Sequence, residues 1–144
     1  MHEVADSLTA AIARTEAQFR ALSEDEAREP LQNGGWSRKQ VIGHLIDSAS
    51  NNHQRFVLLM LNPQVTHPGY EQDGWVNSQR YQERQWSKLL ALWAAYNAHL
   101  AHVIRSVPQN ALANECRIAG GSPVTLEFLM RDYVAHLEHH LRTL

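Results

Sequence analysis

The sequence predicts an all-α protein folded as an antiparallel four-helix bundle. Four segments of the 144-residue chain repeat apolar residues at intervals of three and four, which is the pattern of an amphipathic helix. No segment alternates apolar and polar residues over a sustained stretch, and nearly all glycines and prolines lie between the four segments. A bundle requires four helices of comparable length joined by loops, and a chain of this size is expected to form one domain over residues 1–144.

The first helix is expected over residues 4–22, where a narrow but continuous apolar stripe follows the helical spacing. Residues 23–36 are expected to connect it to the second helix. This connection is acidic at first and then contains Pro30 and the pair Gly34 and Gly35, which favour turns over helix.

The second helix is expected to begin at a capping box. Ser37 is followed three residues later by Gln40, and Trp36 precedes the cap, where it can pack against the first turns. The helical pattern then continues to about residue 61 and ends before Pro63. At 1.5 Å per residue this helix is roughly 35 Å long.

The second half of the chain contains two further helices. Residues 62–74 are expected to form a long loop, which together with the following Trp75 contains the side chains of Tyr70 and Asp73. Long loops with aromatic residues often act as lids. The third helix is expected over residues 81–107, and residues 109–123 connect it to the fourth. Thr125 is expected to cap this last helix, which continues to the end of the chain.

Composition excludes several classes of function. The chain has 13 basic and 15 acidic residues and a formal net charge of −2, so it lacks the broad basic surface that nucleic acids require. No apolar run approaches the roughly 18 residues of a membrane span, and the first residues do not resemble a signal peptide. The single cysteine, Cys116, cannot form an internal disulfide. We therefore expect a cytoplasmic protein with neither nucleic acid nor membrane as a partner.

Three histidines are candidates for a metal site. His136 and His140 lie four residues apart, so they project from one face of the last helix and can share an ion. They continue the stripe of Leu129 and Tyr133, which points into the bundle. His44 occupies the equivalent inward stripe of the second helix. The pattern predicts that the three imidazoles converge from two helices.

A divalent cation would explain three inward imidazoles. Buried polar groups without partners cost roughly 1–3 kcal/mol each, whereas a ligating histidine gives one nitrogen to the ion and the other to an acceptor. Asp47 and Asp132 lie three and four residues from His44 and His136, and are candidate acceptors. Hydrogen-bonded core histidines and solvent-facing acids are the alternatives.

Other reactive side chains are assigned to different roles. His139 is rotated by about 100° from the inward stripe and is expected at the rim or in solvent. His99 and His102 lie three residues apart on the third helix, but His102 leaves the apolar stripe, so a second metal site is not expected there. Cys116 is expected to be structural.

The chain resembles the DinB-like superfamily of DNA-damage-inducible bundle proteins over almost its whole length. The similar segments are WS at residues 36–37, GHLID at residues 43–47 and DYVAHLEHHL at residues 132–141. The closing sequence HLRT at residues 140–143 differs from the common H-R-G-Q of the family, which puts any role of the family's glutamine in doubt.

The resemblance implies a divalent metal on His44, His136 and His140, since family members bind a metal through one histidine of the second helix and two of the last. Better understood relatives transfer or isomerise groups with low-molecular-weight thiols such as bacillithiol or mycothiol. The resemblance thus implies a small-molecule substrate, with a thiol as a candidate cosubstrate.

Three imidazole ligands leave at least one coordination position open, as in catalytic sites, and suit Zn, Ni, Fe or Mn. Such an ion lowers the pKa of water or a thiol toward 7, which starts either hydrolysis or thiol transfer. We therefore expect a metal-dependent thiol S-transferase or small-molecule hydrolase. The alternative is a non-catalytic bundle stabilised by metal, which acts as a binding or stress-response protein.

Several polar and aromatic side chains near these histidines are candidates for a substrate pocket, although each could equally serve packing or core hydrogen bonding. They are Ser48, Asn51, Asn52, Asp73, Trp75 and Tyr133. Arg80 and Arg84 would suit an anionic substrate. Apolar positions on the first and third helices are expected to pair two copies as a homodimer.

Overall fold

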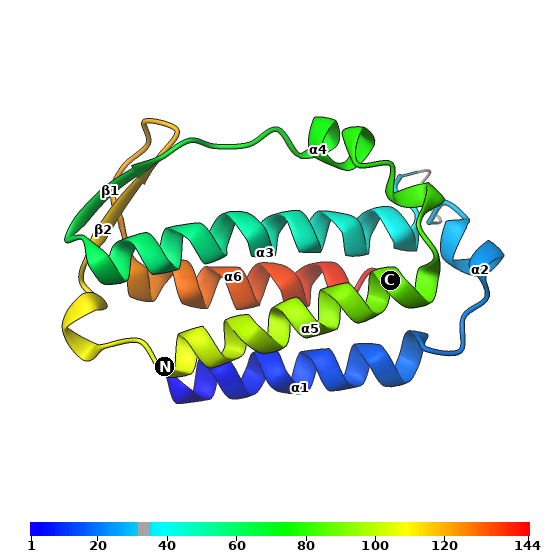
Figure 1. Ribbon diagram of the computed structural model, residues 1–144, viewed down its shortest axis with the longest axis horizontal. Coiled ribbons are helices and arrows are strands. Elements are labelled where there is room, and N and C mark those ends of the chain that lie inside the picture. Colours follow the sequence, from blue (N-terminus) through cyan, green and yellow to red (C-terminus); the bar gives the residue numbers. More distant parts are fainter. Residues whose placement is uncertain (32–34) are drawn as a thin grey trace.

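Four long helices form the body of the protein. The computed structural model describes residues 1–31 and 35–144, and Figure 1 shows the arrangement of the elements. The chain is mostly helical, as its periodicity predicts, and it also contains one small sheet. The four helices are α1 (His2–Phe19), α3 (Arg38–Leu61), α5 (Trp86–Arg105) and α6 (Leu126–Leu141).

The helices do not alternate in direction along the chain. Figure 1 shows α3 and α5 running in the same direction, opposite to α1 and α6. Contacts between helix ends agree: the Trp86 indole at the start of α5 donates to the carbonyl of Phe19 at the end of α1, 3.0 Å away. The antiparallel arrangement expected for all four helices is therefore not confirmed. Helix direction depends on where a connection leads, and residues 62–85 carry the chain back to the end of the bundle at which α3 begins.

Side-chain caps define where two of the helices begin, as predicted. Ser37 Oγ accepts a hydrogen bond from the Gln40 amide at 3.3 Å, and Gln40 Oε1 accepts one from the Ser37 amide at 3.0 Å. Thr125 Oγ1 accepts from the amide of Phe128 at 3.2 Å, which starts α6. The capping box and the threonine cap satisfy amides that no helical carbonyl can reach.

The third predicted helix begins later than expected. A short 3-10 helix, η1 (Tyr81–Glu83), replaces its first turn, and α5 starts only at Trp86. Arg84 and Gln85 are extended between the two. At the other end α5 stops at Arg105, ahead of a second 3-10 helix, η2 (Gln109–Ala111).

The connection after α1 was expected to be loop throughout, but it contains a short helix, α2 (Glu24–Arg28). Ser23 caps it in a second capping box with Glu26. Pro30 pairs with Ser37 through an isolated β-bridge. Of the glycine pair expected in this connection, Gly34 lies outside the described residues and Gly35 is exposed.

A three-stranded sheet lies at the opposite end of the bundle from α2 (Figure 1). Strand β1 (Gln64–His67) pairs in parallel with β2 (Glu115–Ile118), which pairs antiparallel with β3 (Val124–Thr125). The expectation of a chain without strands was wrong in these segments. Strands of four and two residues are too short to establish a period of two in the sequence.

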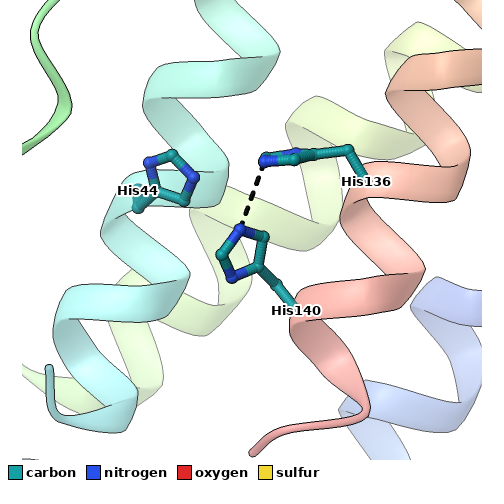
Figure 2. Close-up of side chains that lie close together, drawn as sticks. All are labelled: His44, His136 and His140. Carbon is teal, nitrogen blue, oxygen red and sulfur yellow. Dashed lines mark hydrogen bonds between the residues drawn. The ribbon is translucent and has the colours of Figure 1, made fainter. Parts of the chain in front are cut away.

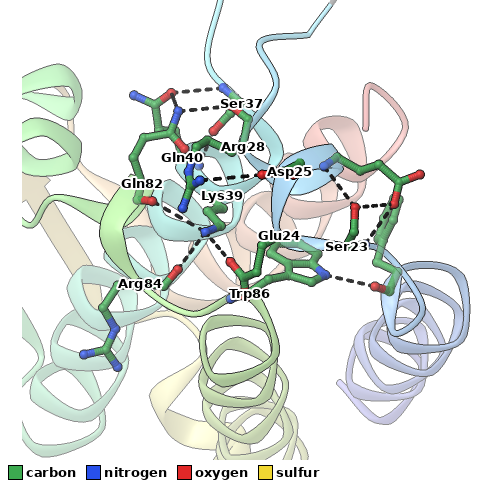
Figure 3. Close-up of polar contacts among 12 residues, drawn as sticks. Ser23, Glu24, Asp25, Arg28, Ser37, Lys39, Gln40, Gln82, Arg84 and Trp86 are labelled. Carbon is green, nitrogen blue, oxygen red and sulfur yellow. Dashed lines mark hydrogen bonds and ion pairs between the residues drawn. The ribbon is translucent and has the colours of Figure 1, made fainter.

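A fully buried lysine ties together the end of the bundle that carries α2 (Figure 3). Lys39 Nζ donates to Glu24 Oε2 at 2.6 Å and to the carbonyl of Arg84 at 2.8 Å. The other oxygen of Glu24 accepts from the amide of Trp86 at 2.6 Å. One ion pair thus joins α2, α3 and the start of α5.

The return connection between α3 and α5 crosses the outer face of α3 and includes α4 (Gln72–Ser78) (Figure 1). None of the described helices is long and apolar enough to cross a membrane.

A homodimer was expected to form through apolar side chains on the first and third of the four long helices, α1 and α5. Of these two helices, α5 exposes Leu92, whereas the other large exposed apolar side chains lie on α3, α4 and α6. The homodimer stays a prediction. These other side chains are Val57, Leu58, Leu61, Trp75 and Phe128.

Candidate metal centre

Three histidine rings point toward one another between α3 and α6 (Figure 2). His44 lies on the second turn of α3, while His136 and His140 lie on the last turns of α6, which runs in the opposite direction. Each offers one ring nitrogen, and these three atoms lie within 4.8 Å of one another. The convergence expected from the two inward stripes is what the structure shows.

The spacing of the rings fits ligands of a single ion. The Nε2 atoms of His136 and His140 are 3.1 Å apart. Two nitrogens bound to one tetrahedral ion at 2.0–2.1 Å are separated by about 3.3 Å. The centre of the His44 ring is 5.4 Å from that of His136 and 4.9 Å from that of His140. Small ring rotations would bring all three nitrogens onto one ion.

His44 is the most deeply buried of the three, with 1% of its surface exposed. Among the described residues, neither of its ring nitrogens has a hydrogen-bond partner. A buried polar atom left unpaired costs roughly 1–3 kcal/mol, so a ligand for these nitrogens would remove a substantial penalty. The donor set and its unpaired atoms therefore fit a divalent transition metal.

Burial keeps the three imidazoles neutral. Desolvation, reinforced by the neighbouring imidazoles, lowers the pKa of His44 and of His140 to about 4. The pKa of His136 is also lowered by burial, although nearby Asp132 opposes the shift. At neutral pH the rings consequently present lone pairs, which is the form that binds a cation.

Trp36 also forms part of this site, through a contact that its position in the sequence does not predict. Its ring centre lies 5.2 Å from that of His44, and its side chain is half-buried. The position before a helix cap predicted packing against the first turns of α3 but not the contact with His44 two turns on.

The two acids considered as acceptors occupy different positions. Asp47 Oδ1 accepts hydrogen bonds from Tyr81 Oη and Gln79 Nε2, both at 2.6 Å, so it is directed to the return connection. Asp132 is exposed on α6. Within the described residues neither acid is hydrogen-bonded to His44 or His136, so the acceptor role is absent from this arrangement.

Comparison with known proteins places the whole site within a family. The sequence pattern of the DinB superfamily matches residues 7–144. The chain belongs to the DinB superfamily. The resemblance of almost the whole chain to this family is thereby confirmed.

Two relatives illustrate this membership of the DinB superfamily. "Putative metal-dependent hydrolase YfiT" of Bacillus subtilis (strain 168) is 23% identical over 130 residues, which are 90% of this chain and 73% of YfiT. A protein of Bacillus mycoides (strain KBAB4) with the same descriptive name is 33% identical over 54 residues, 38% of this chain and 31% of that protein.

A solved structure shows the same fold. YfiT from Bacillus subtilis, described as "a probable metal-dependent hydrolase with an unusual four-helix bundle topology", superposes with a TM-score of 0.88 at 22% identity. The superposition covers 98% of this chain and 81% of that one.

The polar residues of α3 expected in a pocket bond mainly to their own helix. Asn51 Nδ2 donates to the Asp47 carbonyl at 2.9 Å, and Asn52 Nδ2 donates to the Ser48 carbonyl at 3.0 Å. Ser48 and Asn51 are buried, whereas Asn52 is half-buried. Of these residues, Ser48 lies one turn from His44 and so is nearest to it along this DinB-type helix.

The other candidate pocket residues are dispersed. Tyr133 is buried, and its hydroxyl donates to Asn97 Oδ1 on α5, which satisfies it within the core. Asp73 is exposed on α4. Trp75, on the same helix, is 36% exposed and packs against Tyr70, with ring centres 5.1 Å apart.

The remaining candidates lie away from the three histidines. Arg80 is exposed and paired with Glu83, and Arg84 is exposed, with its carbonyl bound to Lys39. His139 is exposed next to His140, as expected. Cys116 is free and fully buried in β2, and burial raises the pKa of its thiol, which favours the structural role.

Proposed function

We propose that this protein is a metal-dependent hydrolase of small molecules, with a divalent ion held by His44, His136 and His140. The observation that carries the proposal is the convergence of three imidazoles whose burial keeps them neutral. Both ring nitrogens of His44 lack a hydrogen-bond partner in the part of the chain that the structure describes. The relatives carry the name of a metal-dependent hydrolase, which supports the proposal.

Imidazole ligands suit Zn, Ni, Fe or Mn, so the donor set defines the class of ion and leaves its identity to measurement. When bound, an ion with three protein ligands has a position open to water or substrate, and it lowers the pKa of water so that hydroxide forms near neutral pH.

The chain's own residues make the site asymmetric. The His44 ring is covered, and Trp36 packs beside it, whereas His136 and His140 remain partly exposed. Substrate would therefore approach from the side of α6. We propose that Ser48, one turn from His44, and Trp36 line the pocket. Asn51, Asn52, Asp73, Trp75 and Tyr133 remain candidates for more distant substrate contacts.

Metal analysis of protein purified without chelators tests the site. His140→Ala is expected to contain one metal ion per chain fewer than wild type. His139→Ala is the matched control, because His139 neighbours His140 but is exposed outside the cluster. Equal metal content per chain in wild type and His140→Ala would overturn the assignment of His140.

Turnover tests the activity. Metal-loaded and metal-stripped protein should be assayed on activated esters and amides, with and without low-molecular-weight thiols. Metal-dependent hydrolysis without thiol supports the proposal. Turnover that requires a thiol would overturn hydrolysis in favour of S-transfer, and absence of turnover under all conditions would favour a non-catalytic bundle stabilised by metal.

A further inference from the structure

A second group of histidines lies on the surface between α3 and α5. His53 is half-buried on α3, while His99 and His102 are exposed on α5. His53 is nine residues beyond His44, which places it about 14 Å further along the helix and on its opposite side. This group is therefore separate from the three-histidine site.

The ring centres of His53 and His99 have the separation expected of two imidazoles on one ion. Their ring centres are 5.1 Å apart, and the ring planes are inclined at 75°. Imidazoles that share a tetrahedral ion have ring centres about 5 Å apart, because each metal–nitrogen bond is about 2.0–2.1 Å. The rings of the three-histidine site span the same range, from 4.6 to 5.4 Å. The centre of the His102 ring is 6.4 Å from that of His99, outside this range.

Tyr96 orients the His53 ring. Its hydroxyl lies 3.2 Å from His53 Nδ1, and burial raises the pKa of this phenol, so it stays neutral. With Nδ1 bound to the hydroxyl, Nε2 is the nitrogen left for a ligand. Metal-ligating histidines almost always have a partner on the second ring nitrogen, and Tyr96 supplies one here.

His53 is also ready to bind a cation. Burial and the nearby His99 both lower its pKa, so the ring is neutral at physiological pH. His99 is exposed on the neighbouring helix, so an ion can reach the pair without rearrangement of the core. From the sequence, only His99 and His102 are expected near each other in this region, because both lie on one helix. The proximity of His53 is not predictable in this way, because α3 and α5 are distant in sequence.

We propose that His53 and His99 form a second binding site for a transition-metal ion that prefers imidazole, such as Zn²⁺ or Ni²⁺. The site has two protein ligands, one from each helix, with the remaining positions filled by water. It lies at the surface where α3 and α5 pack side by side, and it binds its ion independently of the proposed function.

Zn²⁺ binding, measured by equilibrium dialysis, tests the second site in a background of His136→Ala/His140→Ala, where a single histidine of the first site remains. This background is expected to bind one Zn²⁺ per chain. Adding His99→Ala should weaken binding at least about tenfold, because losing even the hydrogen-bond partner of a metal ligand typically costs about 10–100-fold in affinity. Adding His102→Ala is the matched control, because His102 is exposed on α5 like His99. The His102 ring lies outside the range for a shared ion, so this substitution should leave Zn²⁺ binding unchanged.

Failure of this second site can be distinguished from failure of the three-histidine site. Circular dichroism establishes that each variant is helical before dialysis. Absence of Zn²⁺ binding in the folded background would overturn the proposal, as would equal losses from His99→Ala and His102→Ala. Wild type is expected to bind two ions. If the three-histidine site binds none, wild type binds one, and that ion is still lost on His99→Ala.

Discussion

The ring of Tyr81 lies directly against the backbone of Gly43, where a Cβ atom on residue 43 would be only 2.1 Å from Tyr81 Cδ2. The same tyrosine donates its hydroxyl to Asp47 Oδ1, one turn further along α3. Burial raises the pKa of this hydroxyl, which keeps it a donor. Gly43 therefore allows the return connection to dock on α3 beside His44.

Gly43→Ala is expected to destabilise the protein, although alanine is the better helix former by about 1 kcal/mol. The added methyl group cannot coexist with the Tyr81 ring, and overpacking of this kind typically costs about 1–3 kcal/mol. Urea unfolding followed by circular dichroism should show a lower midpoint for the variant.

A double-mutant cycle separates these two effects. In a Tyr81→Ala background the clash is absent, so Gly43→Ala should there be neutral or stabilising by up to about 1 kcal/mol. An equal loss of stability in both backgrounds would show that the close approach of Gly43 and Tyr81 is not the cause.

Asp47→Asn is expected to stabilise the protein at neutral pH. Burial raises the pKa of Asp47 above its ordinary value of 3.8 and outweighs the hydrogen bonds from Tyr81 and Gln79, which lower it. An acid with a raised native pKa holds its proton more tightly in the folded state. The stability that protonated Asp47 contributes is therefore lost as the pH rises from the pKa of Asp47 in the unfolded state through its pKa in the native state.

The measurement is the urea midpoint of metal-free wild type and Asp47→Asn between pH 3 and pH 8. The urea midpoints of the two proteins should coincide at pH values below the pKa of Asp47 in the unfolded state, because Asp47 is then protonated in both the folded and the unfolded state. The variant should be more stable above the native pKa, because its amide is never charged. If Asp47→Asn were less stable than wild type at pH 7, the predicted direction of the stability change would be wrong.

Parts of the fold were predictable from local chemistry, and others depend on distant contacts. Ser37 and Thr125 define their helix starts through neighbours three residues away, so the sequence alone locates both caps. His44 is placed by the apolar stripe of its helix. Lys39 is different, because a lysine at a helix start looks solvent-exposed until Glu24 and the Arg84 carbonyl are known to surround it.

The candidate site divides in the same way. Helical periodicity predicted that three imidazoles face inward, because that property depends only on spacing within each helix. The partners of Asp47 were not predictable. They lie on the return connection, whose path over α3 is set by tertiary contacts such as that between Tyr81 and Gly43.

Lys39→Met is expected to lower the free energy of unfolding by about 1–3 kcal/mol, because the Arg84 carbonyl loses its buried donor while methionine preserves most of the volume. Glu83→Gln is the matched control, since it removes the ion pair of Glu83 with Arg80, whose side chains are 60% and 71% exposed. Exposed ion pairs contribute little to stability, so the free energy of unfolding of Glu83→Gln should equal that of wild type. Equal effects of the two substitutions would show that the buried ion pair does not join the helices as described.

Removal of the metal should lower the melting temperature if His44, His136 and His140 share an ion. A ligand that binds only the folded state at 100 times its dissociation constant contributes about 2.7 kcal/mol, which corresponds to roughly 5–10 °C for a domain of this size. Chelator should therefore destabilise wild type and the His139→Ala control by similar amounts. It should have a much smaller effect on His140→Ala, whose remaining imidazoles cannot complete the site. A chelator-induced shift of the same size in His140→Ala would show that the stabilising ion binds elsewhere.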